Sequence, residues 1–409
     1  MKLQRTDFKS LIPENYIPRS IHNELYNHIT SRKEVTILYG PRQVGKSSEI
    51  INIARIIHNN TPQTDLFYYN LDQPSKDFND VENFISIITT QCEFPENICY
   101  IFIDEAQRLS NIGLFTKYIY DKKLNFKFIL TGSASLDIKE KIKEPLTGRK
   151  KEFYLNSLSL PEILQYNGIE QHRITGYFSE LGDILDKYLI WGGYPEVVLE
   201  PSVERKQEKL EEIADSYILR DMMSLFELGN VDMIRAVSIY LAECIGNLYS
   251  EHGTSMLLSY SRTEVARIIH ALEKSFVLQL IPSFSKHKSK ELLHAKKIYF
   301  HDCGIRNALI SRLDEYVLLS DRGKLFENAI AAHFFTKYGR NKVKFWRTQN
   351  KTEVDFVIQN SISNIEAYET KYVHDKDSIP RSLGSFIGNY NQFIAKSGVI
   401  SRKNYWKYI

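Results

Sequence analysis

The sequence has few cysteines, and they form no recognisable pattern. Four occur among 409 residues, with no CxxC pair and no histidine cluster beside them: Cys92, Cys99, Cys244 and Cys303. Disulfide frameworks and structural zinc sites need thiols in regular, closely spaced patterns. Both kinds of site are therefore disfavoured, and we expect buried free thiols in a reducing compartment.

Long apolar runs and a strong net charge are also missing. No uninterrupted apolar run approaches the roughly 20 residues that cross a bilayer, and the opening residues, MKLQRTDFKSLIPENY, lack the apolar stretch of a secretory signal. The net charge is only +3, which neither requires nor excludes a nucleic-acid partner. We expect a globular cytoplasmic protein with no membrane partner, and its length predicts two or three domains.

Short apolar segments alternate with helical stretches over the first 156 residues. The segments VTILY, LFYYNL, ICYIFI, FKFIL and EFYL are apolar on both faces, as in parallel sheets that helices cover on both sides. We predict an α/β domain over 1–156 with about five strands. Helical periodicity dominates 157–295, and strand-like runs then return, which predicts a helical region followed by a separate α/β domain over 296–409.

A glycine-rich loop follows the first apolar segment. It matches the G-x-x-x-x-G-K-[ST] pattern between a predicted strand and a predicted amphipathic helix. The glycines let backbone N–H groups point at phosphate oxygens, and the helix N-terminus favours the same anion. Lys46 would reach the β- and γ-phosphates of ATP, and the Ser47 hydroxyl would bind Mg²⁺. The predicted ATP-binding residues are Gly40, Pro41, Arg42, Gln43, Val44, Gly45, Lys46, Ser47 and Ser48.

Polar residues follow two later apolar segments, and an arginine precedes the last one. Asp104 would bind the metal through its water shell, and Glu105 would orient or deprotonate the attacking water, unless both are solvated acids that open a helix. Ser133, or as second choice Thr131, would contact this water or the γ-phosphate, unless it caps the next helix. Arg149 could stabilise transition-state charge in its own site or in a neighbouring subunit; otherwise it is a solvated arginine.

These residues, in this order, resemble a family of prokaryotic ATPases with an AAA-like N-terminal domain and a C-terminal domain named DUF4143. The resemblance covers nearly the whole chain and is most specific in GPRQVGK, IDEAQ and EVDF; the other matching segments are YNLD, LTGSAS, LTGR, WGGYPEVVL, YILRDM, KKIYFHDCGIRNAL, FENAIAAHF, WRTQNK and YETKY. It implies a P-loop NTPase core of five strands, in which the Ser133 strand lies between the loop strand and the Asp104 strand. It also implies a winged helix in the middle and a restriction-endonuclease-like fold at the end.

The middle region has the residues that a winged helix would need. SRTE, at 261–264, reads as a capping box before an amphipathic helix, and the strand 276–281, a basic turn and the strand KKIYF follow. Arg262, Arg267 and the lysines of the turn, Lys286, Lys288 and Lys290, could contact DNA phosphates. The alternative is a packing module with a solvated, charged hairpin.

The last domain has a second group of acids. Asp355 and Glu369 would lie on strands, with Lys371 on the same face as Glu369. The carboxylates could hold a second Mg²⁺ or Mn²⁺, completed by Glu327, while Lys371 orients the nucleophile or offsets phosphate charge. This looks like the D…(D/E)-x-K arrangement of the nuclease fold, although a surface ion pair between Glu369 and Lys371 is the alternative.

Two functions remain open at this point. One is an ATP-hydrolysing protein that acts on DNA, in which the nucleotide state controls a winged-helix and nuclease-like half. The other is a nucleotide-dependent switch whose C-terminal domain binds a protein or nucleic-acid partner without cleavage. A metabolite kinase fits less well, because the sequence suggests no acceptor pocket. An Arg149 that acts in a neighbouring subunit would require an oligomer.

Overall fold

The computed structural model describes residues 2–3, 7–72, 78, 80–109, 112–133, 146, 148–169, 178–216, 223, 229–285, 291, 295–361, 363–374 and 378–409. The chain forms two compact units, Met1–Asn156 and Ser157–Ile409. Among the described helices, none is both long and apolar enough to cross a membrane.

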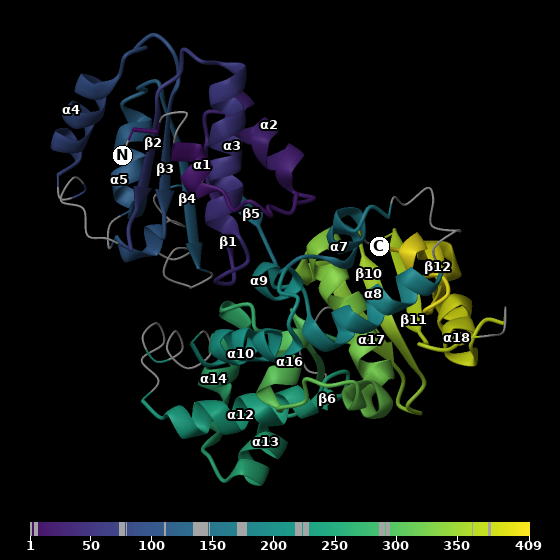
Figure 1. The fold of residues 1–409 in the computed structure, drawn as a ribbon. Coiled ribbons are helices and arrows are strands. Elements are labelled where there is room, and N and C mark those ends of the chain that lie inside the picture. Colours follow the sequence, from purple (N-terminus) through teal and green to yellow (C-terminus); the bar gives the residue numbers. More distant parts are fainter. Residues whose placement is uncertain are drawn as a thin grey trace. The chain divides into compact units, whose positions relative to one another are not determined.

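A five-stranded parallel sheet forms the centre of the first unit (Figure 1). Its strands run in the order β2-β3-β4-β1-β5. They are β1 (Val35–Gly40), β2 (Leu66–Asn70), β3 (Cys99–Asp104), β4 (Phe126–Ser133) and β5 (Lys150–Tyr154). The predicted α/β class is confirmed, and so is the implied position of the Ser133 strand, because β4 lies between β1 and β3.

Helices cover both faces of this sheet, which explains why its strands are apolar throughout. They are α1 (Asp7–Leu11), α2 (His22–Ser31), α3 (Lys46–Asn60), α4 (Val81–Gln91) and α5 (Ile112–Asp121). Figure 1 shows α3 and α2 on one side and α4 and α5 on the other. Helix α3 contacts β1 and β4 and buries Ile53 and Ile57, while Phe84 of α4 and Phe115 of α5 pack into the core of the opposite face.

The second unit contains two sheets. Three antiparallel strands run in the order β6-β8-β7, and four strands in the order β12-β11-β10-β9. The strands are β6 (Leu248–Tyr249), β7 (Leu278–Ile281), β8 (Lys296–Phe300), β9 (Val343–Arg347), β10 (Glu353–Gln359), β11 (Ile365–Thr370) and β12 (Ile394–Ile400). The helices are α7 (Leu160–Tyr166), α8 (Phe178–Trp191), α9 (Pro195–Val198), α10 (Val203–Ala214), α12 (Val231–Glu243), α13 (Glu251–Leu258), α14 (Arg262–Lys274), α16 (Cys303–Leu309), α17 (Tyr316–Tyr338) and α18 (Arg381–Tyr390).

The three-stranded sheet corrects one predicted domain boundary. A boundary between residues 295 and 296 would separate β8 from β6 and β7, with which it shares its backbone hydrogen bonds. Strand β8 therefore belongs with the middle region, because a strand cannot leave its sheet without leaving these groups unpaired. The lysines of the predicted basic turn, Lys286, Lys288 and Lys290, lie outside the described residues.

The WGGYP segment meets the start of α16 through close backbone contacts. A Cβ on Gly192 would lie 2.0 Å from Oδ1 of Asp302, and the residue has a φ of +70° that favours glycine. The backbone N–H of Gly193 donates to Oδ2 of Asp302 at 2.8 Å, while Oδ1 caps α16 by accepting from Ile305 N–H at 3.1 Å. These motif residues therefore maintain the fold of the second unit.

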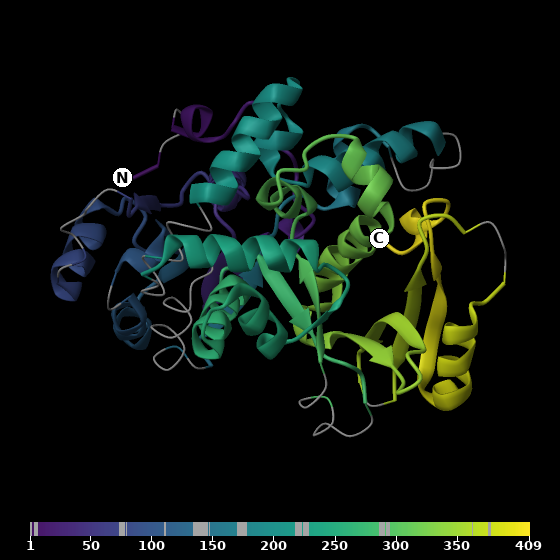
Figure 2. The same ribbon diagram turned by 90° about the horizontal axis from the view of Figure 1, so that it is seen from below.

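The four-stranded sheet is covered by α17 on one face and α18 on the other (Figure 2). Phe356 of β10 contacts Phe334 of α17 with ring centroids 5.4 Å apart, whereas Val354 and Val357 both belong to the core under α18. Strict alternation would place Val354 and Val357 on opposite faces. The pairing of β10 with β9 shifts register between these two valines, so Asp355 lies where the strand is irregular.

Candidate functional site

The glycine-rich loop joins β1 to α3, as the sequence predicts. A Cβ on Gly40 would lie 1.8 Å from the carbonyl oxygen of Leu155, and Gly45 caps α3 with a φ of +92°. Lys46 is only 4% exposed, and its Nζ donates to the carbonyl oxygens of Gly40 at 3.0 Å and Pro41 at 2.6 Å. A buried ammonium held over a concave backbone beside a helix N-terminus fits a phosphate group.

Asp104 ends β3 close to this loop and is 2% exposed. Its carboxylate accepts hydrogen bonds from the hydroxyl of Tyr68, at 2.8 Å, and from the hydroxyl of Thr131. Burial and the charge of Asp104 raise the pKa of Tyr68, so the phenol remains a donor. Thr131 therefore orients Asp104, which differs from its predicted second-choice role as a contact to the γ-phosphate or the water.

Glu105 and Ser133 are brought together by a third residue, Gln107. The Gln107 side-chain amide donates to the Glu105 carboxylate and, at 2.8 Å, to the Ser133 hydroxyl. Glu105 has a φ of 55°, in the left-handed region that non-glycine residues rarely adopt. Because Ser133 pairs in register with Gly40, all three side chains lie at the loop edge of the sheet. Sequence reasoning missed Gln107, although it stands only two positions after Glu105.

Arg149 lies where the parallel strands begin, at the end of the sheet opposite the loop. Its carbonyl oxygen accepts from Val35 N–H at 2.9 Å at the start of β1, whereas the loop begins at Gly40, at the other end of this strand. A strand of this length spans roughly 16 Å. The Arg149 side chain pairs instead with Asp121, with Nε and Oδ1 3.1 Å apart. The predicted role of Arg149 in its own site is therefore wrong, and a role in a neighbouring subunit stays a prediction.

Arg19 supports the loop from the protein side and was not anticipated from the sequence. Its guanidinium is 7% exposed and donates to the carbonyl oxygens of Val44 at 2.7 Å and Asn156 at 2.6 Å. Val44 is in the glycine-rich loop, and Asn156 is the last residue of the first unit. The arginine thus ties the loop backbone to the segment that follows β5. No local motif marks it, because its partners are carbonyl oxygens 25 and 137 positions away.

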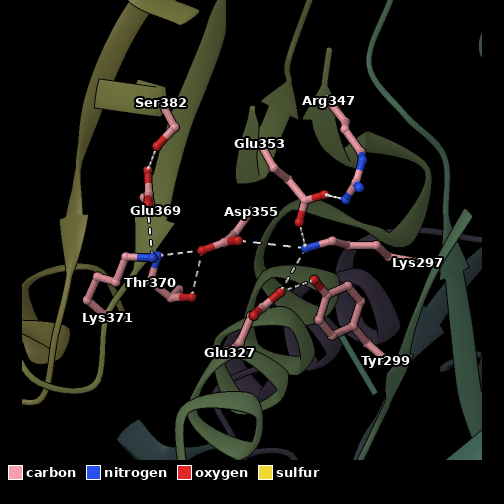
Figure 3. Close-up of polar contacts among 10 residues, drawn as sticks. All are labelled: Lys297, Tyr299, Glu327, Arg347, Glu353, Asp355, Glu369, Thr370, Lys371 and Ser382. Carbon is pink, nitrogen blue, oxygen red and sulfur yellow. Dashed lines mark hydrogen bonds and ion pairs between the residues drawn. The ribbon is translucent and has the colours of Figure 1, made fainter. Parts of the chain in front are cut away.

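The acids predicted in the second unit are electrostatic neighbours (Figure 3). Burial alone would lower the pKa of Lys371, but its hydrogen bond to Glu369 and the charges of Asp355 and Glu327 raise it. Lys371 Nζ lies 3.0 Å from Oε1 of Glu369, whose other oxygen accepts from the hydroxyl of Ser382. Both the backbone N–H and the hydroxyl of Thr370 donate to Asp355, at 2.8 and 2.9 Å.

Lys297 occupies the centre of this group and was missed from the sequence. Its Nζ lies 2.6 Å from Glu353, 3.2 Å from Glu327 and 3.7 Å from Asp355. Burial and the charge of Asp355 raise the pKa of Glu327 to about 7. The second oxygen of Glu353 accepts from Arg347 at 2.6 Å. The sequence could not show this arrangement, because β8 precedes α17 and β10 along the chain and only the fold brings them together.

The predicted metal site of Glu327, Asp355 and Glu369 is not supported by this geometry. Within the described ranges, no group of three or more His, Cys, Asp or Glu side chains is placed to hold a metal ion. The physical reason is that Lys297 lies between Glu327 and Asp355, while Ser382 and Lys371 engage Glu369. The acids are neighbours, but their carboxylate oxygens already pair with cations and hydrogen-bond donors of the protein.

Family models match three segments of the chain. Residues 32–164 match an AAA domain, residues 182–316 a domain of unknown function named DUF8612, and residues 322–405 a domain of unknown function named DUF4143. The first segment contains the glycine-rich loop, Asp104, Glu105 and Ser133, and the last contains the acids of β10 and β11. The chain is an AAA-like P-loop protein with a C-terminal DUF4143 domain.

Relatives of this AAA–DUF4143 chain span most of its length. The uncharacterized protein MJ1544 of Methanocaldococcus jannaschii is 24% identical over 340 residues, which cover 80% of this chain and 72% of that protein. The uncharacterized protein Rv2008c of Mycobacterium tuberculosis is 23% identical over 339 residues, covering 81% and 68%. Among solved structures, the Walker-type ATPase paby2304 of Pyrococcus abyssi matches with a TM-score of 0.49 and 15% identity, over 73% of this chain and 97% of that one.

The AAA-type fold supports nucleotide binding and hydrolysis in the AAA–DUF4143 chain. A phosphate-binding loop, a buried aspartate at the end of a neighbouring strand and an adjacent glutamate lie at one edge of a parallel sheet. In open parallel sheets, ligands bind at the carboxyl ends of the strands. P-loop proteins hold Mg²⁺ with a loop hydroxyl and an acid of this kind, and Ser47 and Asp104 are the residues present for it.

Proposed function

We propose that the first unit binds ATP with Mg²⁺ through Gly40–Ser48 and hydrolyses it. The observation that carries this proposal is the shared position of Lys46, Asp104 and the Glu105–Gln107–Ser133 group at the end of the sheet. Strands β3, β4 and β1 are direct neighbours, and Gly40 pairs with Ser133. A triphosphate at the loop would thus face all of these side chains at once.

Each of these side chains has a distinct task. The Lys46 ammonium would exchange the carbonyl oxygens of Gly40 and Pro41 for phosphate oxygens. When bound with ATP, Mg²⁺ would supply positive charge that offsets the charge of the phosphates. Ser47 and, through water, Asp104 would hold this ion. Glu105 would orient the attacking water or accept its proton, with Gln107 and Ser133 fixing the carboxylate.

The variant Glu105→Gln tests hydrolysis apart from binding. We expect kcat for phosphate release to fall by about 100-fold or more, since a general base contributes at least that factor, while affinity for a fluorescent ATP analogue stays within about twofold. Glu24→Gln is the matched control, because Glu24 is an exposed acid of α2. Full activity in Glu105→Gln would exclude Glu105 as the base. Failure of Lys46→Ala to weaken ATP binding would refute the site itself.

We further propose that the nucleotide state controls a DNA-binding second unit. The order α12, β6, α13, α14, β7, β8, with β6 beside β8, is typical of a winged helix and supports this part. Helix α14 begins with a capping box at Ser261 and Glu264 and buries Val265, Ile268 and Ile269. Its opposite, exposed face carries Arg262, Thr263, Arg267 and His270. A helix with exposed basic side chains is suited to DNA phosphates and the major groove.

A duplex-DNA binding assay with and without ATP tests this role. The double variant Arg262→Ala/Arg267→Ala should lose about tenfold or more in affinity, and its salt dependence should become shallower because two phosphate contacts are removed. Arg205→Ala, on the exposed side of α10, is the control and should bind like wild type. Equal binding by all three proteins would favour the alternative function. In that case the second unit binds a protein partner, and ATP-dependent capture of that partner would survive loss of α14 arginines.

Arg149 keeps one proposed role, in a neighbouring subunit. Its side chain is 36% exposed and paired with Asp121 at the edge away from its own loop. Arg149 could therefore reach a nucleotide-binding loop only in an oligomer, where the loop belongs to a second copy of the chain. If light scattering shows a monomer at all nucleotide states and Arg149→Ala retains full ATPase activity, this role is excluded.

A further inference from the structure

One buried ammonium in the second unit has three carboxylates as neighbours (Figure 3). Lys297 comes from β8, and its side chain is 3% exposed. Its Nζ lies 2.6 Å from Oε1 of Glu353, 3.2 Å from Oε1 of Glu327 and 3.7 Å from Oδ1 of Asp355. These acids come from β10 and α17, so the lysine joins the three-stranded sheet to the elements of the DUF4143 domain.

Most oxygens of the acid group already have protein partners. Glu353 is shared between Lys297 and Arg347, and Glu369 between Lys371 and Ser382. Oδ2 of Asp355 accepts from both donors of Thr370, while Oδ1 faces Lys297. Oε1 of Glu327 accepts from Lys297 and from the hydroxyl of Tyr299. Each carboxylate is thus neutralised or hydrogen-bonded by groups that belong to the chain.

A divalent ion would have to displace several of these partners together. Mg²⁺ needs oxygen ligands at about 2.0–2.1 Å in a nearly octahedral arrangement, whereas the carboxylates here surround an ammonium at 2.6 to 3.7 Å. Burial alone would lower the pKa of Lys297, but the charges of Glu327, Asp355 and Glu353 raise it above its ordinary value. The lysine therefore stays charged, and a second cation at the same place would be repelled at short range.

We propose that Lys297 is a permanent internal cation in the place that a divalent metal ion would take, so that this cluster binds no Mg²⁺ or Mn²⁺. The DUF4143 domain then acts by binding a partner, without metal-dependent cleavage. This inference concerns the second unit alone and does not depend on ATP hydrolysis by the first. It identifies Lys297, Glu327, Glu353 and Asp355 as one ion-pair cluster that closes the nuclease-like site.

Binding of Mn²⁺ to the nucleotide-free full chain, followed by electron paramagnetic resonance, tests the proposal on wild type directly. Asp355→Asn is the comparison, because it removes one carboxylate charge at the centre of the cluster. We expect the same amount of bound Mn²⁺ in both proteins at about 1 mM free ion, a concentration that would fill even a weak oxygen site. One extra Mn²⁺ in wild type that is lost in Asp355→Asn would overturn the proposal.

A charge-matched double variant tests the position of the lysine. Lys297→Met/Glu353→Gln removes one positive and one negative charge and leaves Glu327, Asp355 and Glu369 in place. We expect it to gain one Mn²⁺, and to lose it again when Asp355→Asn is added. A folded double variant with no additional Mn²⁺ would show that Lys297 is not in a metal position. If the double variant does not fold, the wild-type comparison still decides.

DNA cleavage gives an independent readout of the same inference. Wild type should not cut single- or double-stranded DNA with Mg²⁺ or Mn²⁺, in the presence or absence of ATP. Cleavage that disappears in Asp355→Asn would overturn the inference while leaving the proposed ATPase intact. Conversely, loss of ATPase activity in Glu105→Gln has no bearing on the Mn²⁺ count, so the two proposals fail separately.

Discussion

Replacement of Arg19 by methionine should destabilise the phosphate-binding loop, because it removes the hydrogen bond that holds the loop backbone at Val44. The guanidinium makes two short hydrogen bonds, to Val44 O at 2.7 Å and Asn156 O at 2.6 Å, in a position that is 7% exposed. A hydrogen bond from a charged donor contributes about 1.5–3 kcal/mol, and an unpaired buried carbonyl adds a desolvation cost. Methionine keeps most of the aliphatic packing. We therefore expect unit 1 to lose about 3 kcal/mol of unfolding free energy.

Calorimetry of the full chain measures this loss. The transition that ATP shifts upward belongs to the first unit, because a ligand stabilises the part that binds it. For about 150 residues, 3 kcal/mol corresponds to a Tm decrease of roughly 6–12 °C. ATP affinity should also fall, by about tenfold, which is about 1.4 kcal/mol, since Arg19 no longer fixes the peptide group between Val44 and Gly45.

The matched control is Arg55→Met, on the helix that follows the loop. Arg55 is exposed and donates to Oδ1 of Asn52 at 2.7 Å within α3. Its loss should change Tm by about 1 °C or less and leave the ATP affinity unchanged. If Arg19→Met behaves like Arg55→Met in both measurements, Arg19 does not hold the loop, and our account of the site's support is refuted.

Two further predictions concern the fold of each unit. In Gly40→Ala the new Cβ would meet Leu155 O at 1.8 Å, so the first unit should lose about 3 kcal/mol or more by calorimetry. Among the described residues, nothing lies within 4 Å of a Cβ on Gly229, so Gly229→Ala should change stability by about 0.5 kcal/mol or less. Equal losses would contradict the close approach at Gly40. Burial and the charge of Lys337 lower the pKa of His333 to about 3, from an ordinary value of 6.5. Between these pH values the unfolded chain binds a proton that the folded one does not, so His333 destabilises the second unit progressively as pH falls from 6.5 towards 3. The unfolding free energy of wild type should therefore fall by about 2–4 kcal/mol more than that of His333→Gln over this range, and parallel pH profiles would exclude the effect.

The loop and the central sheet were predictable because their signals are local. The loop GPRQVGKS lies between an apolar strand and an amphipathic helix, and the two glycines, the lysine and the serine that phosphate binding requires lie within eight positions. Strand β3 ends in Asp104 as predicted, and the doubly apolar strands already indicated a parallel sheet covered by helices. Strand order came from the family resemblance, since apolar segments alone do not specify their neighbours.

The failures concern residues whose role depends on distant partners. Arg149 ends the LTGR segment, which suggests a catalytic arginine. However, β5 runs parallel to β1, so its start lies at the end of the sheet away from the loop. The acids of β10 and β11 were found by their spacing, yet a register shift in β10 and Lys297 from β8 decide what surrounds Asp355. The boundary at residue 295 failed for the same reason, because β8 pairs with strands that precede it.

The sequence by itself determined the P-loop, the acids beside it and the α/β class of the first unit, because backbone hydrogen bonding and side-chain periodicity act over a few residues. The tertiary structure alone decided that Arg19 holds the loop, that Gln107 joins Glu105 to Ser133, and that Lys297 lies among Glu327, Glu353 and Asp355. Charges act through space, and their strength depends on burial and distance. Neither quantity exists until the chain has folded.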